Sequence, residues 1–315
     1  MADYSRAVST TRTAAPGTMT RQAWLLFAAM SVIWGIPYLL IKVAVTELSP
    51  AAVAGSRTLL AALILLPLAA HQGALRPALA LWRWVLAFAL LEMAGPWLLL
   101  GHAETRVSSS FAGLMLATVP LIGVLIAGLR GEPNAFAPIR LRGLLVGILG
   151  VVGLVGLDSQ AGAVDLLSVV ELLLVAVGYA AAPVIANTVL AGVPSMGVIA
   201  VSVAAVAVLY LPWTVGGYAG GGISGDVLAS VLILGLLCTA VAFVLFFRLI
   251  SLAGPVRATV ITFFNPAVAL GLGILVLGES LTTGMLLGFP LVILGAYWAT
   301  RSPAAGSGAP SPTTT

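Results

Sequence analysis

Three residues of the apolar stretch VIWGIPYLLIKVAV, residues 32–45, have side chains that could hold a charged ligand. Trp34, Tyr38 and Lys42 are spaced four residues apart, so on a helix they fall within an arc of about 80°. Lys42 is the only lysine in the chain. An ammonium group beside two aromatic rings could bind a carboxylate, or its flexible stem could carry the charge to the membrane interface.

Three further charged residues, Arg57, Glu92 and Glu171, also lie inside long apolar stretches. A charge at the centre of a membrane costs about 2.5–3.5 kcal/mol on insertion scales, so each needs an explanation. Arg57 could meet a substrate anion, bond helix-end carbonyls or extend to the interface. Glu92, in AFALLEMAGPWLLL, must be protonated, paired or hydrated, and it is therefore a candidate proton carrier.

Glu171 marks another polar position, and Tyr179 lies two turns further along the same predicted helix. We predict that Glu171 pairs with Lys42 or Arg57 and helps to close an outer gate. Asn187 and Asn265 are polar groups inside apolar stretches, and both are candidate substrate contacts. The predicted substrate-binding residues are therefore Trp34, Tyr38, Lys42, Arg57, Glu92, Glu171, Tyr179, Asn187 and Asn265.

Composition indicates the medium in which these residues lie. Hydrophobic residues make up 61% of the chain, charged residues 8%, and the mean hydropathy is +1.15. A soluble protein carries about 25% charged residues, so this chain must be solvated by lipid. With one cysteine and two histidines, neither a disulfide, a metal site nor a cofactor is predicted. The pI is 9.6, but the arginines do not cluster as in a groove-binding patch, so nucleic acid is not a predicted partner.

Ten stretches are long and apolar enough to cross a membrane as helices of about 20 residues. They are 23–45, 50–70, 82–102, 108–129, 141–157, 166–190, 195–213, 227–250, 256–277 and 281–300. The polar segment 1–21 is predicted to be a tail rather than a signal peptide, and 301–315 to be disordered. The predicted fold class is an all-α membrane protein with ten transmembrane helices.

The arginines predict how these spans are oriented. If the N-terminus lies in the cytoplasm, eleven arginines fall on the inner side, and Arg106 alone falls on the outer side. The positive-inside rule then predicts an even number of spans and two cytoplasmic termini. The inner arginines are residues 6, 12, 21, 76, 83, 130, 140, 142, 248, 257 and 301. We expect a multi-pass protein of the plasma membrane, with residues 214–226 outside.

The sequence also contains an internal repeat with a period of 146 residues. Pro37 and Pro183 are separated by this interval, and so are Pro120 and Pro266. The phrases PLIGVLIAGLRGE and PAVALGLGILVLGE follow the second proline of each pair. Each predicted half has five spans, so the second half must be inverted relative to the first. Inverted repeats with helix breakers near the bilayer centre are typical of secondary transporters.

The repeat predicts the domain organisation and four hinges. The first half covers residues 22–157 and the second covers 158–300, with the two tails outside them. The four prolines are predicted hinge or kink positions. Asn265 directly precedes Pro266, so its amide could bond a carbonyl that the proline leaves free instead of contacting a substrate.

Two phrases resemble a known family. WGIPYLLIKVAV, followed by LSPAAVAGSRTLLAALIL, is similar to the opening of the drug/metabolite transporter superfamily, EamA type, and NPAVALGLGILVLGESLTTGMLLGFPLVILGAYWA is similar to its closing phrase. The resemblance covers about residues 22–300. It implies a ten-helix bundle of two inverted repeats that moves small metabolites, often outward. The second half has Thr188 and Val203 in place of Lys42 and Arg57, so a charged site would be asymmetric.

These observations favour a secondary transporter of the exporter type over two alternatives. A membrane-embedded enzyme acting on a lipid-linked substrate would need clustered acid–base or metal-binding side chains, and no such motif is present. A channel would need one continuous pore rather than two kinked, inverted halves. The expected partners are a small-molecule metabolite such as an amino acid, membrane lipid and a coupling proton, in a monomer or homodimer.

Overall fold

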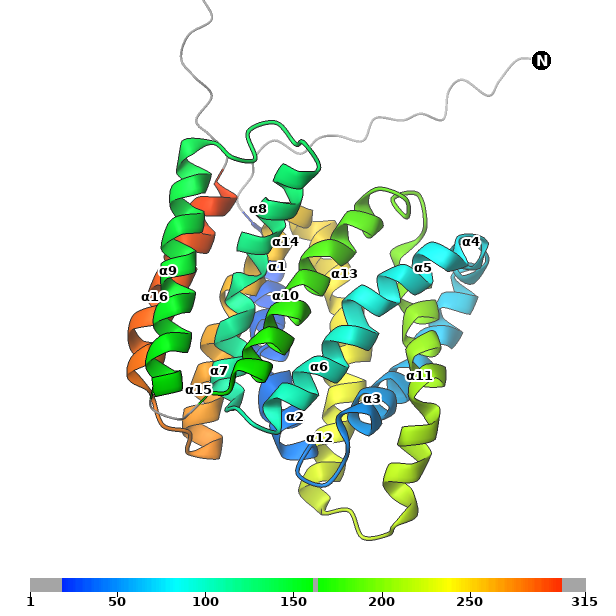
Figure 1. The fold of residues 1–315 in the computed structure, drawn as a ribbon. Helices are drawn as coiled ribbons and strands as arrows, with labels where there is room; N and C mark the ends of the chain where they lie inside the picture. Colours follow the sequence, from blue (N-terminus) through cyan, green and yellow to red (C-terminus); the bar gives the residue numbers. More distant parts are fainter. Residues whose placement is uncertain (1–18, 161–163, 302–315) are drawn as a thin grey trace, which may run out of the picture.

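The computed structural model of the protein describes residues 19–160 and 164–301, and within these ranges every regular element is helical (Figure 1). Ten segments among these described residues are long and apolar enough to cross a membrane, as predicted. The spans consist, in chain order, of α1 (Arg21–Ile33) with α2 (Ile36–Ala44); α3 (Pro50–His71); α5 (Trp82–Ala89) with α6 (Gly95–Glu104); α7 (Ser109–Met115) with α8 (Val119–Leu129); α9 (Pro138–Gln160); α10 (Leu166–Asn187); α11 (Ser195–Ala219); α12 (Gly225–Gly235) with α13 (Ala242–Ala253); α14 (Pro255–Thr259) with α15 (Asn265–Leu277); and α16 (Thr283–Thr300). The short helix α4 (Leu75–Ala80) connects α3 to α5.

Hydroxyl and carboxylate side chains mark where six of the spans begin. Each accepts a hydrogen bond from a backbone N–H three residues further on, which satisfies a donor that the first helical turn leaves free. The Oγ of Ser49 accepts from Ala52 at 3.2 Å, and Oδ1 of Asp165 accepts from Ser168 at 2.9 Å. The six capping residues are Thr20, Ser49, Ser108, Asp165, Ser224 and Thr282.

The two halves of the chain have opposite orientations. Helix α1 begins and α16 ends at the face drawn at the top of Figure 1, which we call the terminal face. The opposite face, where α6 ends and α10 begins, is called the distal face. The first span of the first half therefore begins at the terminal face, and the first span of the second half begins at the distal face (Figure 1). The fold is two inverted five-helix repeats.

Three of the four predicted hinge prolines follow an irregular turn. Pro37 comes after the break at Trp34–Gly35, while Pro120 and Pro266 follow the 3₁₀ turns Leu116–Thr118 and Val260–Phe263. A proline has no N–H for the carbonyl four residues earlier, so the helix is interrupted there. At Pro183, by contrast, α10 continues without a break, and a kink at this residue stays a prediction.

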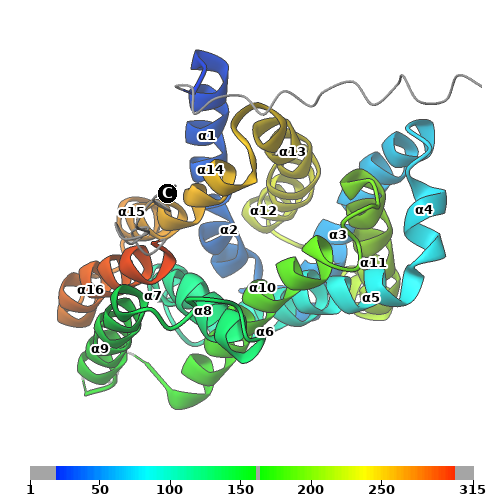
Figure 2. The same ribbon diagram turned by 90° about the horizontal axis from the view of Figure 1, so that it is seen from above.

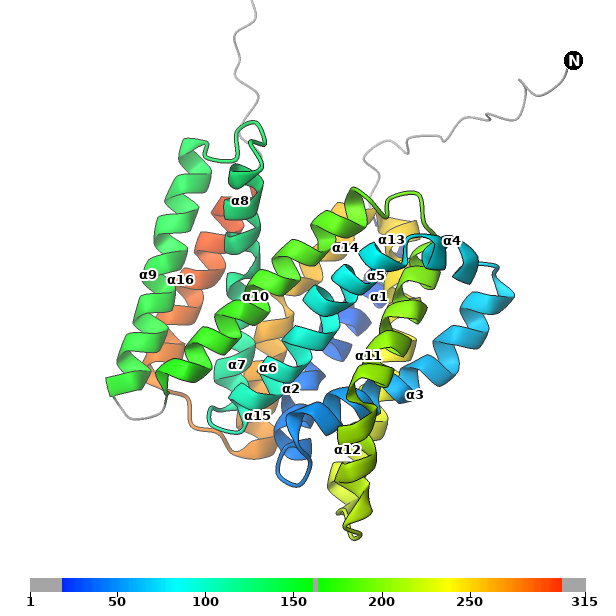
Figure 3. The ribbon, with the colours of Figure 1, turned by 45° about the vertical axis from the view of Figure 1, so that its right-hand side comes forward.

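Pairs of equivalent spans flank the bundle. Helices α9 and α16, spans 5 and 10, pack against each other on one side, and α3 and α11, spans 2 and 7, on the other (Figures 2 and 3). Glycines allow the first pair to approach closely. A Cβ atom added at Gly150 would lie 2.6 Å from the nitrogen of Val292, and one added at Gly295 would lie 2.3 Å from the nitrogen of Gly147.

Several predicted boundaries need correction. Residues 214–226 were expected to form an outer loop, but α11 continues to Ala219 and leaves a shorter connection. Span 5, predicted as 141–157, is the longer helix Pro138–Gln160. Arg21, assigned to the tail, is the first residue of α1 because Thr20 caps that helix. Of the predicted tails, residues 1–18 and 302–315 lie outside the described residues.

Candidate functional site

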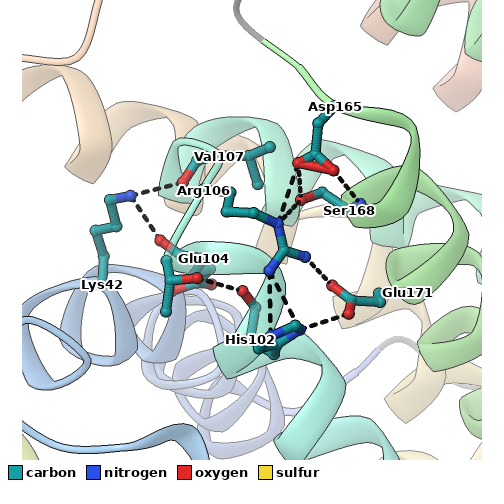
Figure 4. A network of polar contacts seen from close by, with 9 residues as sticks. Lys42, His102, Glu104, Arg106, Val107, Asp165, Ser168 and Glu171 are labelled. Carbon is teal, nitrogen blue, oxygen red and sulfur yellow. Dashed lines mark hydrogen bonds and ion pairs between the residues drawn. The ribbon is translucent and has the colours of Figure 1, made fainter.

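A network of charged side chains joins the two halves at the distal face (Figure 4). Arg106, just after α6, donates to Glu171 of α10, and its Nε also donates to Asp165 at 3.2 Å. Nδ1 of His102 lies 2.5 Å from the second oxygen of Glu171. The side chain of Glu171 is only 7% exposed, so its two oxygens have exchanged water for these two partners. We call Arg106, Glu171, His102, Asp165 and Ser168 the distal lock.

The predicted partners of Glu171 were therefore wrong. Sequence reasoning paired it with Lys42 or Arg57, whereas the structure pairs it with Arg106 and His102. Arg106 was treated as a loop residue because it follows the apolar stretch. Its side chain reaches back over the end of α6 to α10 (Figure 4).

The ammonium group of Lys42 binds backbone oxygens. Its Nζ donates to the carbonyl of Glu104 at 2.6 Å and to that of Val107 at 2.7 Å. These carbonyls belong to the last turn of α6 and the connection to α7, where the helix leaves acceptors free. Lys42 thus holds the end of α6 from the side opposite to the distal lock (Figure 4).

Glu104 is a buried carboxyl group that sequence reasoning missed. It has 0% exposure, and neither of its carboxyl oxygens has a hydrogen-bond partner among the described residues. Lys42 and Arg57 are the cations within its electrostatic reach. The sequence HAETR places Glu104 at the end of an apolar stretch, where a hydropathy window treats it as a loop residue.

Arg57 lies deeper than Lys42 and joins α3 to the second half. Its side chain is buried, and its guanidinium carbon lies 3.8 Å from the centroid of the Trp97 ring, within the range of a cation–π contact. Its Nε and one terminal nitrogen donate to Oγ1 of Thr239 at 3.3 and 3.1 Å. Among the described residues, Arg57 forms no ion pair. Charge on Arg57 is therefore held by a ring face and a hydroxyl group rather than by a carboxylate.

Two π-helical turns occupy equivalent positions in the two halves. They cover Leu90–Ala94 and Leu236–Val241, which are offset by the repeat period. A π turn shifts the backbone register and leaves carbonyls to be satisfied by side chains. The hydroxyl of Tyr210 donates to the carbonyl of Ala94 at 3.0 Å, and Oγ1 of Thr239 donates to that of Leu234 at 2.8 Å.

Each π turn is thus linked to span 2 or span 7 of the opposite half. Tyr210 of α11 binds the first turn, and Arg57 of α3 binds Thr239 of the second. The similar phrases LLEMA and LLCTA, offset by the same period, carried a sequence signal for this symmetry. Glu92 and Cys238 occupy matching places in these phrases.

Tyr179 of α10 links Arg57 to Glu92 and Tyr38. Glu92 is half-buried on its π turn, and Tyr179 of α10 lies within electrostatic reach of Glu92, Arg57 and Glu104. Tyr38 of α2 is buried within reach of Tyr179 and Glu104. The structure therefore brings together Arg57, Glu92, Tyr38 and Tyr179 near the bundle centre. Trp97, which the sequence analysis did not select, completes this group, which we call the central cluster.

Trp34 and Asn187 lie elsewhere. The Trp34 ring packs against Phe243 and Phe246, with centroids 5.9 and 4.7 Å away. The break at Trp34–Gly35 also interrupts the continuous helix on which Trp34, Tyr38 and Lys42 were expected to share a face. Asn187 is the exposed last residue of α10 at the terminal face rather than a polar group inside a span.

Asn265 connects two helix breaks. When its amide nitrogen faces the neighbouring carbonyls, it donates to Ile261 at 2.9 Å and to Ser31 at 3.1 Å. The amide of Gly35 bonds Val32 instead of Ser31, which leaves the Ser31 carbonyl free. Asn265 therefore bonds a carbonyl freed by the break in span 1 rather than one freed by Pro266, since the Ile261 carbonyl also accepts from the amide of Phe264.

Two carboxylates outside the spans fix the distal loops. The Ser168 hydroxyl and amide, followed by the guanidinium of Arg106, lower the pKa of Asp165 below its usual 3.8. The backbone N–H of Ser224 donates to Glu47 at 2.8 Å and lowers the pKa of this carboxyl below its usual 4.5. Both residues join one half of the chain to the other.

Comparison with known proteins identifies the family. The family model described as "EamA-like transporter family" matches residues 22–156 and again residues 166–301. The chain belongs to the EamA-like transporter family. This membership makes it a multi-pass membrane transporter of small solutes rather than an enzyme, in agreement with the resemblance drawn from its sequence.

Other comparisons bear on the fold only. No curated protein matches the chain. A solved structure described as "Crystal structure of protein" is similar, with a TM-score of 0.62 and 21% sequence identity. The similarity covers 88% of this chain and 96% of the other. The same helical architecture thus occurs in a protein of very different sequence.

Proposed function

We propose that this EamA-like transporter exports small metabolites, such as amino acids, across the plasma membrane by alternating access. The arginine distribution supports an orientation in which the terminal face is cytoplasmic and the distal face is outside. Inverted repeats support the mechanism, because two similar halves of opposite orientation can exchange conformations and open the centre to each side in turn.

Buried Arg57 is the observation that carries the proposal of a substrate site. It is a permanent cation at the junction of the two halves, and it forms no ion pair among the described residues. A substrate carboxylate could replace Thr239 as its partner and form a stronger, charge-assisted bond. Trp97, Tyr179 and Tyr38 supply ring surfaces, and Glu92 supplies an acceptor for a substrate amine. An anionic or zwitterionic metabolite fits this set.

The remaining predicted residues have supporting roles in this proposal. Lys42 and Glu171 hold the end of α6, and Asn265 couples the breaks that precede Pro37 and Pro266. Trp34 lines the aromatic contact between span 1 and span 8, and Asn187 lies at the terminal-face end of α10. A monomer contains both halves, so a homodimer is not needed for transport.

The distribution of polar contacts between the halves supports a closed distal side. The distal lock, the pair Glu47–Ser224 and the bonds that Ser109 and Ser110 donate to the Glu279 carboxylate all lie at the distal face. At the terminal face, a bond from Arg140 to the carbonyl of Arg301 is a corresponding contact. In the proposed cycle these distal contacts break when the transporter opens outward.

A flux assay tests the proposal. Purified protein in liposomes is offered a panel of labelled metabolites with anionic, zwitterionic, cationic and neutral groups, with and without a pH gradient. We expect counterflow of anionic or zwitterionic members and little of the cationic ones. Transport of cations alone would contradict the role of Arg57, and a lack of counterflow for every member would contradict the proposed function.

A further inference from the structure

We infer that Glu104, rather than Glu92, is the carboxyl group that binds and releases the coupling proton. The inference rests on the proposed function, because a coupling proton has meaning only in a transport cycle. It is carried by the burial of Glu104, by its missing hydrogen-bond partners and by its place between two contacts that hold α6.

Burial limits what Glu104 can bind in this conformation. The residue has no exposed surface, and both carboxyl oxygens lack a donor among the described residues. An ionised carboxylate in such a place would lose its hydration without compensation, so the neutral, protonated form is favoured. A proton needs no cavity, whereas a substrate amine or a hydrated metal ion would. The site therefore fits a proton.

Charged and titratable groups face Glu104 from each neighbouring element. Lys42 and Tyr38 come from α2, Arg57 from α3 and Tyr179 from α10, while Glu279 follows α15. Only Lys42 and Arg57 are cations, and neither forms an ion pair with Glu104. The charge that would stabilise ionised Glu104 is therefore nearby but bound to other partners.

Lys42 supplies the counter-ion for the ionised form. Its Nζ already lies 2.6 Å from the backbone carbonyl of Glu104 itself. A small shift of the end of α6 would exchange this neutral acceptor for the carboxylate of the same residue. The ammonium group would then gain a charge-assisted bond when Glu104 loses its proton to water. Protonation and the position of α6 are linked in this way.

The distal lock controls access to this carboxyl group. Figure 4 shows Lys42 on one side of the α6 end and the side chains of Arg106, His102 and Glu171 on the other. When α10 separates from α6, the lock opens and water can reach Glu104 from the distal side. Glu104 then exchanges a proton with that water, and reclosure isolates the proton from it.

Infrared difference spectroscopy tests proton binding without a substrate. The full-length protein is titrated in lipid, and the carbonyl stretching band of protonated carboxyl groups is followed. We expect a band that is lost in Glu104→Gln and retained in Glu92→Gln and in the exposed control Glu132→Gln. In Lys42→Gln, which keeps a donor for the backbone carbonyls, the band should persist to higher pH. A band that survives in Glu104→Gln, or one lost in Glu92→Gln, would overturn the inference.

Flux measurements separate this inference from the proposed function. Stimulation by a pH gradient should disappear in Glu104→Gln and persist in Glu132→Gln. If Glu104→Gln is still stimulated, the inference is wrong while the transporter assignment stands. If the wild type transports but ignores the gradient, the coupling role is likewise excluded. If the wild type moves no metabolite, the proposed function itself fails, and the infrared band still decides whether Glu104 holds the proton.

Discussion

Arg106 donates to the carboxylate of Glu171, and this ion pair joins the end of the first half's third span to the start of the second half's first span. Both partners come from segments that must separate if the distal side is to open. The pair is also flanked by His102 and Asp165, so its loss would weaken a network rather than a single contact.

Removing the ion pair should open the distal side more often. We expect Arg106→Gln and Glu171→Gln each to raise the labelling rate of Cys238 by an impermeant thiol reagent several-fold. Cys238 suits this measurement because it is the only cysteine, is buried and lies near Arg57. The control Arg130→Gln removes a partner of the exposed pair with Glu132, 4.0 Å apart on the terminal face. Equal labelling of all four proteins would show that the pair does not close the distal side.

Acid should loosen the distal loops. The pKa values of Glu47 and Asp165 are lowered by their hydrogen bonds in the folded state, so these bonds stabilise the fold above the usual values of 4.5 and 3.8. Their contribution is lost as the pH falls through the lowered values. We expect the Tm of the purified protein to fall between about pH 4.5 and 3, since unperturbed carboxyls titrate near pH 4.

Neutral variants provide the comparison for this acid effect. Glu47→Gln and Asp165→Asn should have a lower Tm than the wild type at pH 7 and a smaller further decrease on acidification. Glu132→Gln, at the terminal face, should follow the wild type throughout. An acid profile in both variants that is parallel to the wild type would contradict this assignment.

Much of the fold was predictable because lipid imposes a simple pattern. Each span must be long and apolar, so ten spans follow from the sequence. The charge on the connecting loops favours an even number of spans. Proline positions predicted three of four breaks for a chemical reason, the missing N–H. Pro183 differs because α10 continues through it, which the missing N–H alone does not predict.

The site was less predictable because it depends on pairing across the two halves. Arg57 was selected as a buried charge, but its partners Trp97 and Thr239 lie 40 and 182 residues away along the chain. Glu104 and Arg106 were overlooked because they follow an apolar stretch and resemble loop residues. Glu104 is buried and Arg106 is bonded to Glu171 only because segments distant in sequence pack against the end of α6.

Close packing of spans 5 and 10 should be sensitive to single methyl groups. A Cβ at Gly150 would lie 2.6 Å from a backbone nitrogen and 2.9 Å from a backbone oxygen of α16, so the helices must move apart. We expect Gly150→Ala to cost about 1–3 kcal/mol of stability, as overpacked sites do. Gly156→Ala in the same helix is the control, because nothing lies within 4 Å of its Cβ. Equal thermal stability of the two variants would contradict this packing.

Arg57 should set substrate affinity. Hydrogen bonds to charged groups contribute about 1.5–3 kcal/mol, so Arg57→Ala should raise the KM of an anionic substrate about ten- to a hundredfold. Arg57→Lys keeps the charge but loses the planar group that stacks on Trp97, so its effect should be intermediate. Arg83→Lys, over Trp82 at 5.4 Å, is a matched control in an exposed pair. An unchanged KM in Arg57→Ala would remove Arg57 from the substrate site.

The orientation of the transporter can be tested with two glycines that differ mainly in the face on which they lie. Gly220 lies in the connection between α11 and α12 at the distal face, and Gly192 lies in that between α10 and α11 at the terminal face. Both are exposed, have no neighbour within 4 Å of an added Cβ and lack a positive φ, so a cysteine should fit at either position without strain. The native Cys238 is buried and adds little background.

We expect an impermeant maleimide added to intact cells to label Gly220→Cys and not Gly192→Cys, because eleven arginines favour a cytoplasmic terminal face. After permeabilisation, both variants should be labelled, which shows that each cysteine is reactive. The reverse pattern in intact cells would mean that the terminal face is outside. The distal lock would then close the cytoplasmic side, and Glu104 would exchange its proton with the cytoplasm instead of the exterior.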